Sequence, residues 1–147
     1  VVAARLTLGA ATGTGGVSLM RQVASWPGVG DVCRSLAPLP RVGPSPPSTG
    51  YADLRQVALA RLLVDNIESI QIDWALYGPK LAQVALTFGV DDVDAVPVVG
   101  VEEQGWRRSN GEVIRRNIAG AGFTAVPRNG RFEPVAVEAS AERHGGR

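Results

Sequence analysis

Short apolar runs alternate with amphipathic stretches along the chain. Apolar runs at 2–9, 32–38, 69–74 and 92–98 predict strands, and apolar residues recur at helical spacing between them. This order is typical of an α/β protein with parallel strands and crossover helices. An open doubly wound sheet and part of a (β/α)8 barrel both fit this pattern. A whole barrel needs about 250 residues, so we expect roughly half of a TIM-type barrel at most.

The helix ends carry recognisable signals. Asp53 is expected to cap a helix whose apolar face includes Leu62, and Pro79 is expected in the first turn of the next helix, whose apolar stripe runs to Phe88. A last helix is followed by an apolar run at 123–128 that predicts a final strand.

The chain has room for one core, so a single domain or part of one is expected. We assign a partial barrel to 1–136, with a Pro-rich exposed loop at 37–50, and a disordered tail to 137–147. The chain starts at Val1, inside a strand-like run and without a Met, which fits a fragment or a processed product.

Charge and rare residues narrow the function classes. The net charge of +1 and the absence of a polybasic run argue against nucleic acid or an anionic membrane as partner. No apolar run approaches the roughly 20 residues that span a bilayer, and no signal peptide is recognisable, so the cytoplasm is the expected location. The single histidine, His144, argues against a Ser-His-Asp triad or an HExxH zinc site, and the single cysteine, Cys33, argues against a multi-cysteine site.

Polar residues alternate with apolar ones in the run IQIDW. Ile70, Ile72 and Trp74 share one side of the predicted strand, while Gln71 and Asp73 share the other. In a barrel, inward side chains near the carboxyl end of a strand point into the site. Gln71 and Asp73 are therefore candidates, with Trp74 ending the strand at the mouth, unless the register is shifted by one residue.

The next predicted strand adds Asp92 and Asp94 to these candidates, and we expect both to share one concavity with Gln71, Asp73 and Trp74. Capping of helices on the outer surface is the competing interpretation. The Gly-rich turn 9–16 is a separate alternative, a phosphate cradle at a helix N-terminus, although it matches neither GxGxxG nor GxxxxGK[ST].

Four further motifs carry a family resemblance. They are L-L-x-D-N at 62–66, I-x-x-x-W at 70–74, G-x-K-L-A-Q at 78–83 and G-x-D-D at 89–92. With the flanking residues from about 51 to 133, they resemble the C-terminal half of one radical S-adenosylmethionine group. That group comprises aminofutalosine synthase, dehypoxanthine futalosine cyclase and the ring-joining subunit of deazaflavin synthase.

The resemblance implies a (β/α)8 barrel that cleaves S-adenosylmethionine at a [4Fe-4S] cluster. In aminofutalosine synthase the adenosyl radical is then added to an enolpyruvyl-oxybenzoate, in menaquinone biosynthesis. The family's C-x-x-x-C-x-x-C motif is absent here, and Ala10-Ala11-Thr12 stands where relatives tend to have His-x-Glu. We therefore expect no cofactor on this chain alone, a missing N-terminal half or separate subunit as partner, and a small-molecule substrate. A non-catalytic α/β module remains the alternative.

The predicted site contains two groups of residues. The catalytic candidates are Asp73 and Asp94, and the substrate-binding candidates are Asn66, Gln71, Trp74 and Asp92.

Overall fold

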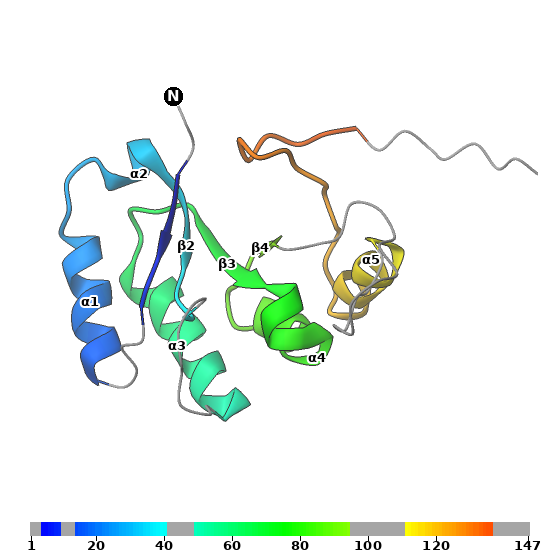
Figure 1. The fold of residues 1–147 in the computed structure, drawn as a ribbon, viewed down its shortest axis with the longest axis horizontal. Helices are drawn as coiled ribbons and strands as arrows, with labels where there is room; N and C mark the ends of the chain where they lie inside the picture. Colours follow the sequence, from blue (N-terminus) through cyan, green and yellow to red (C-terminus); the bar gives the residue numbers. More distant parts are fainter. Residues whose placement is uncertain (1–3, 10–13, 41–48, 95–110, 137–147) are drawn as a thin grey trace, which may run out of the picture.

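The computed structural model describes residues 4–9, 14–40, 49–94 and 111–136, and Figure 1 draws them in colour. The elements follow the predicted alternation of strand and helix. In chain order they are β1 (Ala4–Thr7), α1 (Thr14–Ala24), α2 (Val29–Val32), β2 (Cys33–Ala37), α3 (Gly50–Leu63), β3 (Ser69–Asp73), α4 (Trp74–Leu86), β4 (Asp92–Asp94) and α5 (Gly111–Gly120).

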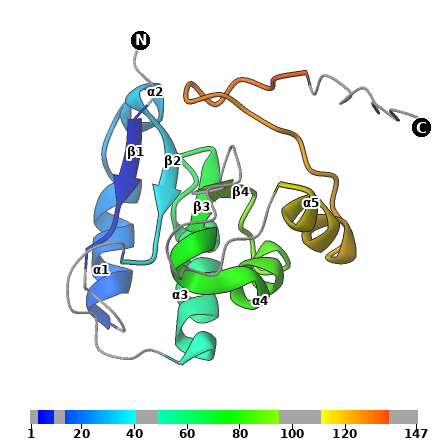
Figure 2. The same ribbon diagram turned by 45° about the vertical axis from the view of Figure 1, so that its right-hand side comes forward.

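The four strands form one parallel sheet in the order β1-β2-β3-β4, and they lie side by side in Figures 1 and 2. The predicted α/β fold with parallel strands is confirmed. Four strands with their helices are consistent with half of a TIM-type barrel. The strand predicted at 92–98 is present at Asp92–Asp94, and its remainder lies outside the described residues.

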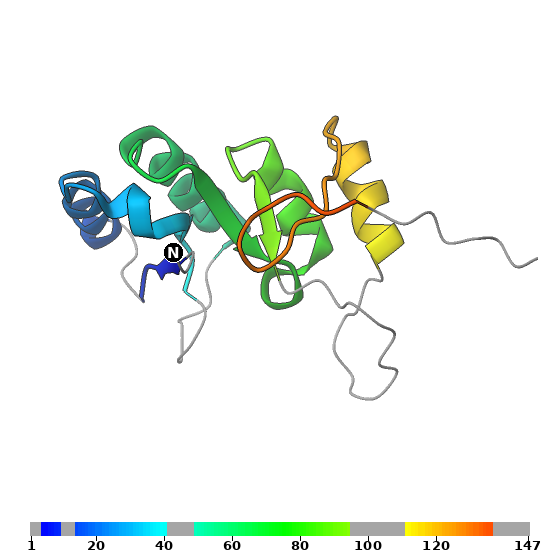
Figure 3. The same ribbon diagram turned by 90° about the horizontal axis from the view of Figure 1, so that it is seen from above.

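Helices α1, α3 and α4 cover one face of the sheet, which Figure 3 shows from above. The apolar side chains of the strands, including Leu36, Ile70 and Ile72, are buried in a core with Val57 of α3. Removing such side chains from water is the main stabilising contribution to the fold. We call the opposite face of the sheet the inner face.

Helix α3 corrects two predictions. Its N-cap is Thr49, whose hydroxyl accepts a hydrogen bond from Ala52 N at 3.3 Å, so the helix starts before the predicted cap, Asp53, which is buried in its first turn. Leu62, predicted on the buried face, is exposed. The helix instead buries a partly polar face, because Gln56 donates to the carbonyl of Pro38 at 2.9 Å.

The contact with Pro38 also corrects the predicted exposure of the Pro-rich loop. Its described beginning, Pro38 to Pro40, is buried, and the hydroxyl of Tyr77 donates to the carbonyl of Pro40. The loop is therefore anchored to α3 and α4 at this end.

Helix α4 confirms the predicted place of Pro79 at the start of a helical segment. Gly78 has φ 80° and ψ 163°, outside the helical region, and it separates a first turn, Trp74–Tyr77, from the segment that Pro79 begins. The predicted apolar stripe is wrong in part, because Val84 and Phe88 are exposed. The buried residues of α4 are Trp74, Ala82, Ala85 and Leu86.

The final strand predicted at 123–128 is wrong. After α5 the chain turns at Gly122, which has φ 89°, and joins no ladder of the sheet. Its only described pairing is an isolated antiparallel bridge between Arg128 and Pro134. Residues 127–135 form a tight turn, in which the side-chain oxygen of Asn129 accepts from the backbone N–H groups of Arg131 and Glu133. Phe123 and Val126 of the run at 123–128 are exposed, so this apolar run does not form one face of a half-buried strand.

Candidate functional site

Polar side chains of three strands meet on the inner face of the sheet. Gln71 is in register with Asp92, and Asp73 is in register with Asp94, so neighbouring residues of β3 and β4 share one face. Gln71 Nε2 donates a hydrogen bond to Asp92 Oδ2. The sequence-predicted alternation on β3 is therefore the observed one, with Gln71 and Asp73 on the inner face.

A second segment reaches Asp92 from the turn after α5. Arg128 Nε donates to Asp92 Oδ1 and Arg128 Nη2 to Asp92 Oδ2, both at 2.6 Å, which is a bidentate ion pair. The two side chains are 24% and 11% exposed. The hydrogen bond to Asp92 raises the pKa of Arg128 above its ordinary value, against the effect of partial burial. The guanidinium is therefore charged at neutral pH.

Two local contacts hold the Arg128 side chain in place. Its guanidinium lies over the ring of Phe132, 4.1 Å from the centroid. Phe132 has a positive φ of 64°, unusual for a residue other than glycine, and its N–H donates to the carbonyl of Asn129. The turn 127–135 thus presents Arg128 to β4 in a fixed orientation.

Arg5 of β1 reaches the same cluster from the other edge of the sheet. Its Nη1 donates to Gln71 Oε1 at 3.2 Å and to Asp94 Oδ2 at 2.5 Å. The Arg5 and Asp94 side chains are 37% and 32% exposed. The cluster therefore runs as a continuous chain of hydrogen bonds from Arg5 through Gln71 and Asp92 to Arg128.

The cluster has two levels along the strands. Asp73 and Asp94 end the described parts of β3 and β4, while Gln71 and Asp92 lie two residues earlier. In barrel enzymes, chemistry belongs to the carboxyl ends of the strands, and the levels beneath serve stability. By position, Asp73 and Asp94 lie at the upper level, and the buried Gln71 and the mostly buried Asp92 lie beneath them.

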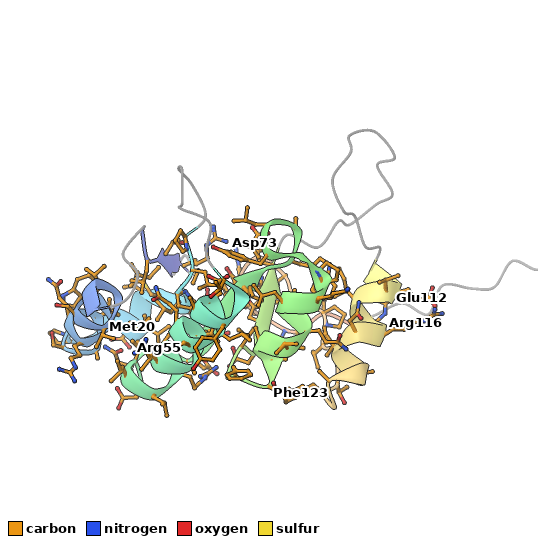
Figure 4. All side chains as sticks on the ribbon, turned by 90° about the horizontal axis from the view of Figure 1, so that it is seen from below. Met20, Arg55, Asp73, Glu112, Arg116 and Phe123 are labelled. Carbon is orange, nitrogen blue, oxygen red and sulfur yellow. The ribbon has the colours of Figure 1, made fainter. Side chains whose placement is uncertain are left out.

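Asp73 also has a structural contact. Its Oδ1 accepts a hydrogen bond from Leu76 N at 2.8 Å and so caps the first turn of α4. Figure 4 views the molecule from the end at which the strands finish and shows Asp73 beside the first turn of α4. Asp73 therefore caps a helix, as the competing interpretation expected of the carboxylates, but it does so from the inner face of the sheet.

Two predicted site residues lie elsewhere. Trp74 is 1% exposed and packs in the core with Ile70 and Ile72, because it continues their side of the strand into α4. Its indole Nε1 has no hydrogen-bond partner in the described part of the chain.

Asn66 lies at the opposite end of the sheet, before β3 begins. Its Nδ2 donates to the carbonyls of Val23, Ala24 and Trp26, at 3.0, 3.3 and 3.3 Å. These carbonyls belong to the end of α1 and the residues after it, where a helix leaves acceptors without intrahelical partners. Asn66 therefore ties a helix end and lies apart from the inner-face cluster, and its role in substrate binding stays a prediction.

Arg5 and Arg128 were missed as site residues. A charged residue inside the apolar run at 2–9 was a signal that β1 has a polar face, so Arg5 could have been found. Arg128 carries no comparable signal, because it reaches β4 by a turn formed after α5.

A family model described as the CofH/MqnC C-terminal region matches residues 35–141. The chain belongs to this family. The match confirms the resemblance read from residues 51 to 133 and extends it to β2.

Three relatives show how much of a full-length protein this member covers. It is 53% identical over 47 residues to aminodeoxyfutalosine synthase of Thermus thermophilus, which is 32% of this chain and 13% of that protein. It is 33% identical over 96 residues to the protein of the same name in Streptomyces coelicolor, which is 58% of this chain and 24% of that protein. It is 32% identical over 94 residues to a 5-amino-6-(D-ribitylamino)uracil–L-tyrosine 4-hydroxyphenyl transferase of Methanosarcina barkeri. The match is 60% of this chain and 24% of that protein. The chain thus spans less than a quarter of each relative.

One family-like motif, G-x-D-D at 89–92, has a structural explanation in this CofH/MqnC member. Asp91 Oδ1 accepts from Ile70 N at 2.8 Å and from Ser69 Oγ at 2.7 Å, and its Oδ2 accepts from Arg61 Nη2 at 2.7 Å. Arg61 Nε also donates to the carbonyl of Gly89 at 2.8 Å. The first Asp of the motif therefore aligns β3 with the start of β4, and the second, Asp92, enters the inner-face cluster.

The chain does not fit an iron–sulfur cluster. Such clusters are held by three or four thiolates, and the sequence contains one cysteine, Cys33. Among the described residues, no group of three or more His, Cys, Asp or Glu is arranged to hold a metal ion. Within the same residues, no helix is both long and apolar enough to cross a membrane. Residues 10–13 of the Gly-rich turn and the tail 137–147 lie outside the described part, so the predictions made for them stay predictions.

Proposed function

We propose that this chain is the substrate-side part of a radical S-adenosylmethionine enzyme of the aminofutalosine synthase type, acting on a small molecule in the cytoplasm. The observation that carries the proposal is the family match over residues 35–141. The half-barrel architecture and the polar inner face at the carboxyl ends of β3 and β4 support it.

In this proposal the two levels of the cluster have different roles. Asp94, with Arg5 beside it, contacts the substrate, and Asp73 is the second catalytic carboxylate at the same level. Gln71 and Asp92 act from beneath by holding Arg5 and the Arg128 turn in place. A carboxylate at this level is suited to accept or donate a proton, or to orient a hydroxyl group of the substrate.

S-adenosylmethionine and the [4Fe-4S] cluster would be bound by an N-terminal half, on the same polypeptide or on a separate subunit. Since this chain offers a single thiol, the cluster-binding cysteines would have to come from that half. Its strands would pair with β1 and β4, the two edges of the described sheet. The alternative, a phosphate-binding module that uses the Gly-rich turn 9–16, has no contact among the described residues in its favour.

The test is complementation with the N-terminal part of the Thermus thermophilus relative, prepared without the region that this chain matches. We expect the two pieces to form a stable complex that produces 5′-deoxyadenosine or an adenosyl adduct from S-adenosylmethionine. This chain alone should bind no stoichiometric iron after anaerobic reconstitution.

Variants of the complex test whether Asp94 takes part in the reaction or only stabilises the fold. Asp94→Asn should lower the turnover number at least roughly tenfold, since general acid–base groups contribute about 10²-fold or more. Glu112→Gln, an exposed change on α5, is the matched control and should leave turnover unchanged. A complex with full turnover in the Asp94→Asn variant would remove Asp94 from the mechanism. A failure of the two pieces to associate would overturn the assignment as a barrel half.

A further inference from the structure

The two arginines of the inner-face cluster use their guanidinium groups differently. Arg128 has its Nε–Nη2 edge filled by the carboxylate of Asp92, with both bonds at 2.6 Å. Arg5 is bonded through Nη1 alone, to Gln71 Oε1 and Asp94 Oδ2. Its Nε and Nη2 have no hydrogen-bond partner in the described part of the chain, and its side chain is 37% exposed.

The unused edge of Arg5 has a defined chemical preference. Two parallel N–H groups of a guanidinium match the two oxygens of a carboxylate, and Arg128 with Asp92 realises this geometry in the same cluster. Arg5 is also oriented in advance, because its Nη1 is held by acceptors on two different strands. A group fixed in this way loses little conformational freedom when a ligand binds.

A buried hydroxyl next to Arg5 is the second observation. Ser35 of β2 is in register with Arg5 of β1, so the two side chains start from adjacent positions on one face. Ser35 is 0% exposed, and its Oγ has no hydrogen-bond partner among the described residues. A buried polar group without a partner is unfavourable, and an incoming acceptor would remove that penalty.

We propose that Arg5 and Ser35 form a binding site for the carboxylate of a small molecule. The Nε–Nη2 edge of Arg5 holds both carboxylate oxygens, and Ser35 Oγ donates to one of them. Only the identity of the natural ligand rests on the function proposed above, since the site is built from this chain's own residues. The neighbouring carboxylate of Asp94 repels the ligand, so an isolated carboxylate binds in the millimolar range.

The test follows the Nε–H signal of Arg5 by NMR during titration of the full chain with sodium benzoate. Benzamide, a neutral molecule of the same shape, is the matched ligand control. We expect a saturable shift with benzoate, with a Kd of roughly 1–10 mM, and no shift with benzamide. A shift of equal size with benzamide, or with sodium chloride at the same ionic strength, would overturn the proposal.

Variants then assign the contact. Arg5→Gln should abolish benzoate binding, followed in this variant through the backbone amide signals of Ser35 and Gln71 because it has no guanidinium Nε–H. Ser35→Ala should weaken binding severalfold. Asp94→Asn should tighten binding about threefold to tenfold, because it removes a like charge near the ligand while its amide oxygen still accepts from Arg5. This gain cannot arise from misfolding. Arg116→Gln on α5, well apart from Asp73 in Figure 4, should leave Kd unchanged.

The outcomes separate the two proposals. Benzoate binding that depends on Arg5, without activity in the complemented enzyme, would leave the carboxylate site standing and refute the proposed function. Activity with no benzoate effect at Arg5, or with equal affinity in the Asp94→Asn variant, would refute the carboxylate site alone.

Discussion

The ion pair between Arg128 and Asp92 holds the turn after α5 against the sheet, and its removal should destabilise the whole fold. Arg128→Met keeps the length and most of the apolar stem of the side chain but removes two hydrogen bonds of 2.6 Å. It leaves a carboxylate that is 11% exposed without its cation. Breaking such a mostly buried pair from one side lowers the free energy of unfolding by about 2–4 kcal/mol.

A matched control is provided by the ion pair between Arg116 and Glu112 on α5, whose side chains are 76% and 60% exposed. Arg116→Met should change the free energy of unfolding by at most about 0.5 kcal/mol, because an exposed pair at this spacing contributes little. Adding Asp92→Asn to Arg128→Met should recover more than half of the loss, since no uncompensated charge then remains.

The assay is urea unfolding followed by tryptophan fluorescence, to which the buried Trp74 contributes, and, independently, by circular dichroism. With a slope of about 2 kcal/mol per molar urea, the Arg128→Met midpoint should fall by roughly 1–2 M. Equal midpoints for Arg128→Met and Arg116→Met would refute the reasoning. So would a double variant with Asp92→Asn that is less stable than Arg128→Met alone.

Two further predictions concern residues outside the inner face. Gly89→Ala should lower the free energy of unfolding by about 2–3 kcal/mol, because Gly89 has φ 113° and a new Cβ would lie 2.8 Å from Arg61 Cβ. Gly130→Ala, where nothing lies within 4 Å, should be neutral within about 0.5 kcal/mol in the same urea assay. Asn66→Asp should cost at least as much as Asn66→Ala, since a carboxylate has no N–H for the carbonyls after α1, and neither change should alter the Kd for benzoate.

The sequence predicted side-chain directions correctly where they follow from the two-residue repeat of a strand alone. Alternation in IQIDW placed Gln71 and Asp73 on one side of β3 and Ile72 on the other, as the structure has them. It was misleading for Trp74, whose position at a strand end was taken for the mouth of a site. Period two places this side chain with the isoleucines, in the core.

Helix faces were harder to predict than strand faces, because polar residues with long-range partners lie on them. Gln56 is buried on α3 to bond the carbonyl of Pro38, and this turns Leu62 toward solvent. Asn66 resembled a site residue by its place in a motif, although its partners are carbonyls about 40 positions earlier in the chain. No local pattern encodes such pairings, since they exist only after the elements have packed.

The curvature of the sheet cannot be predicted from the pattern of any single strand. The ion pair between Arg5 and Asp94 shows that the sheet is curved. Arg5 is in register with Ser35, and Ser35 with Ser69, whereas Asp94 is in register with Asp73, four residues further along β3. On a flat sheet, three strand spacings of about 4.8 Å and four rises of about 3.3 Å would separate Arg5 from Asp94 by roughly 19 Å.

Two extended side chains and one hydrogen bond reach about 13 Å at most. Since Arg5 Nη1 lies 2.5 Å from Asp94 Oδ2, the sheet must curl toward its inner face, as the wall of a barrel does. That curvature gathers residues of β1, β3 and β4 into one cluster.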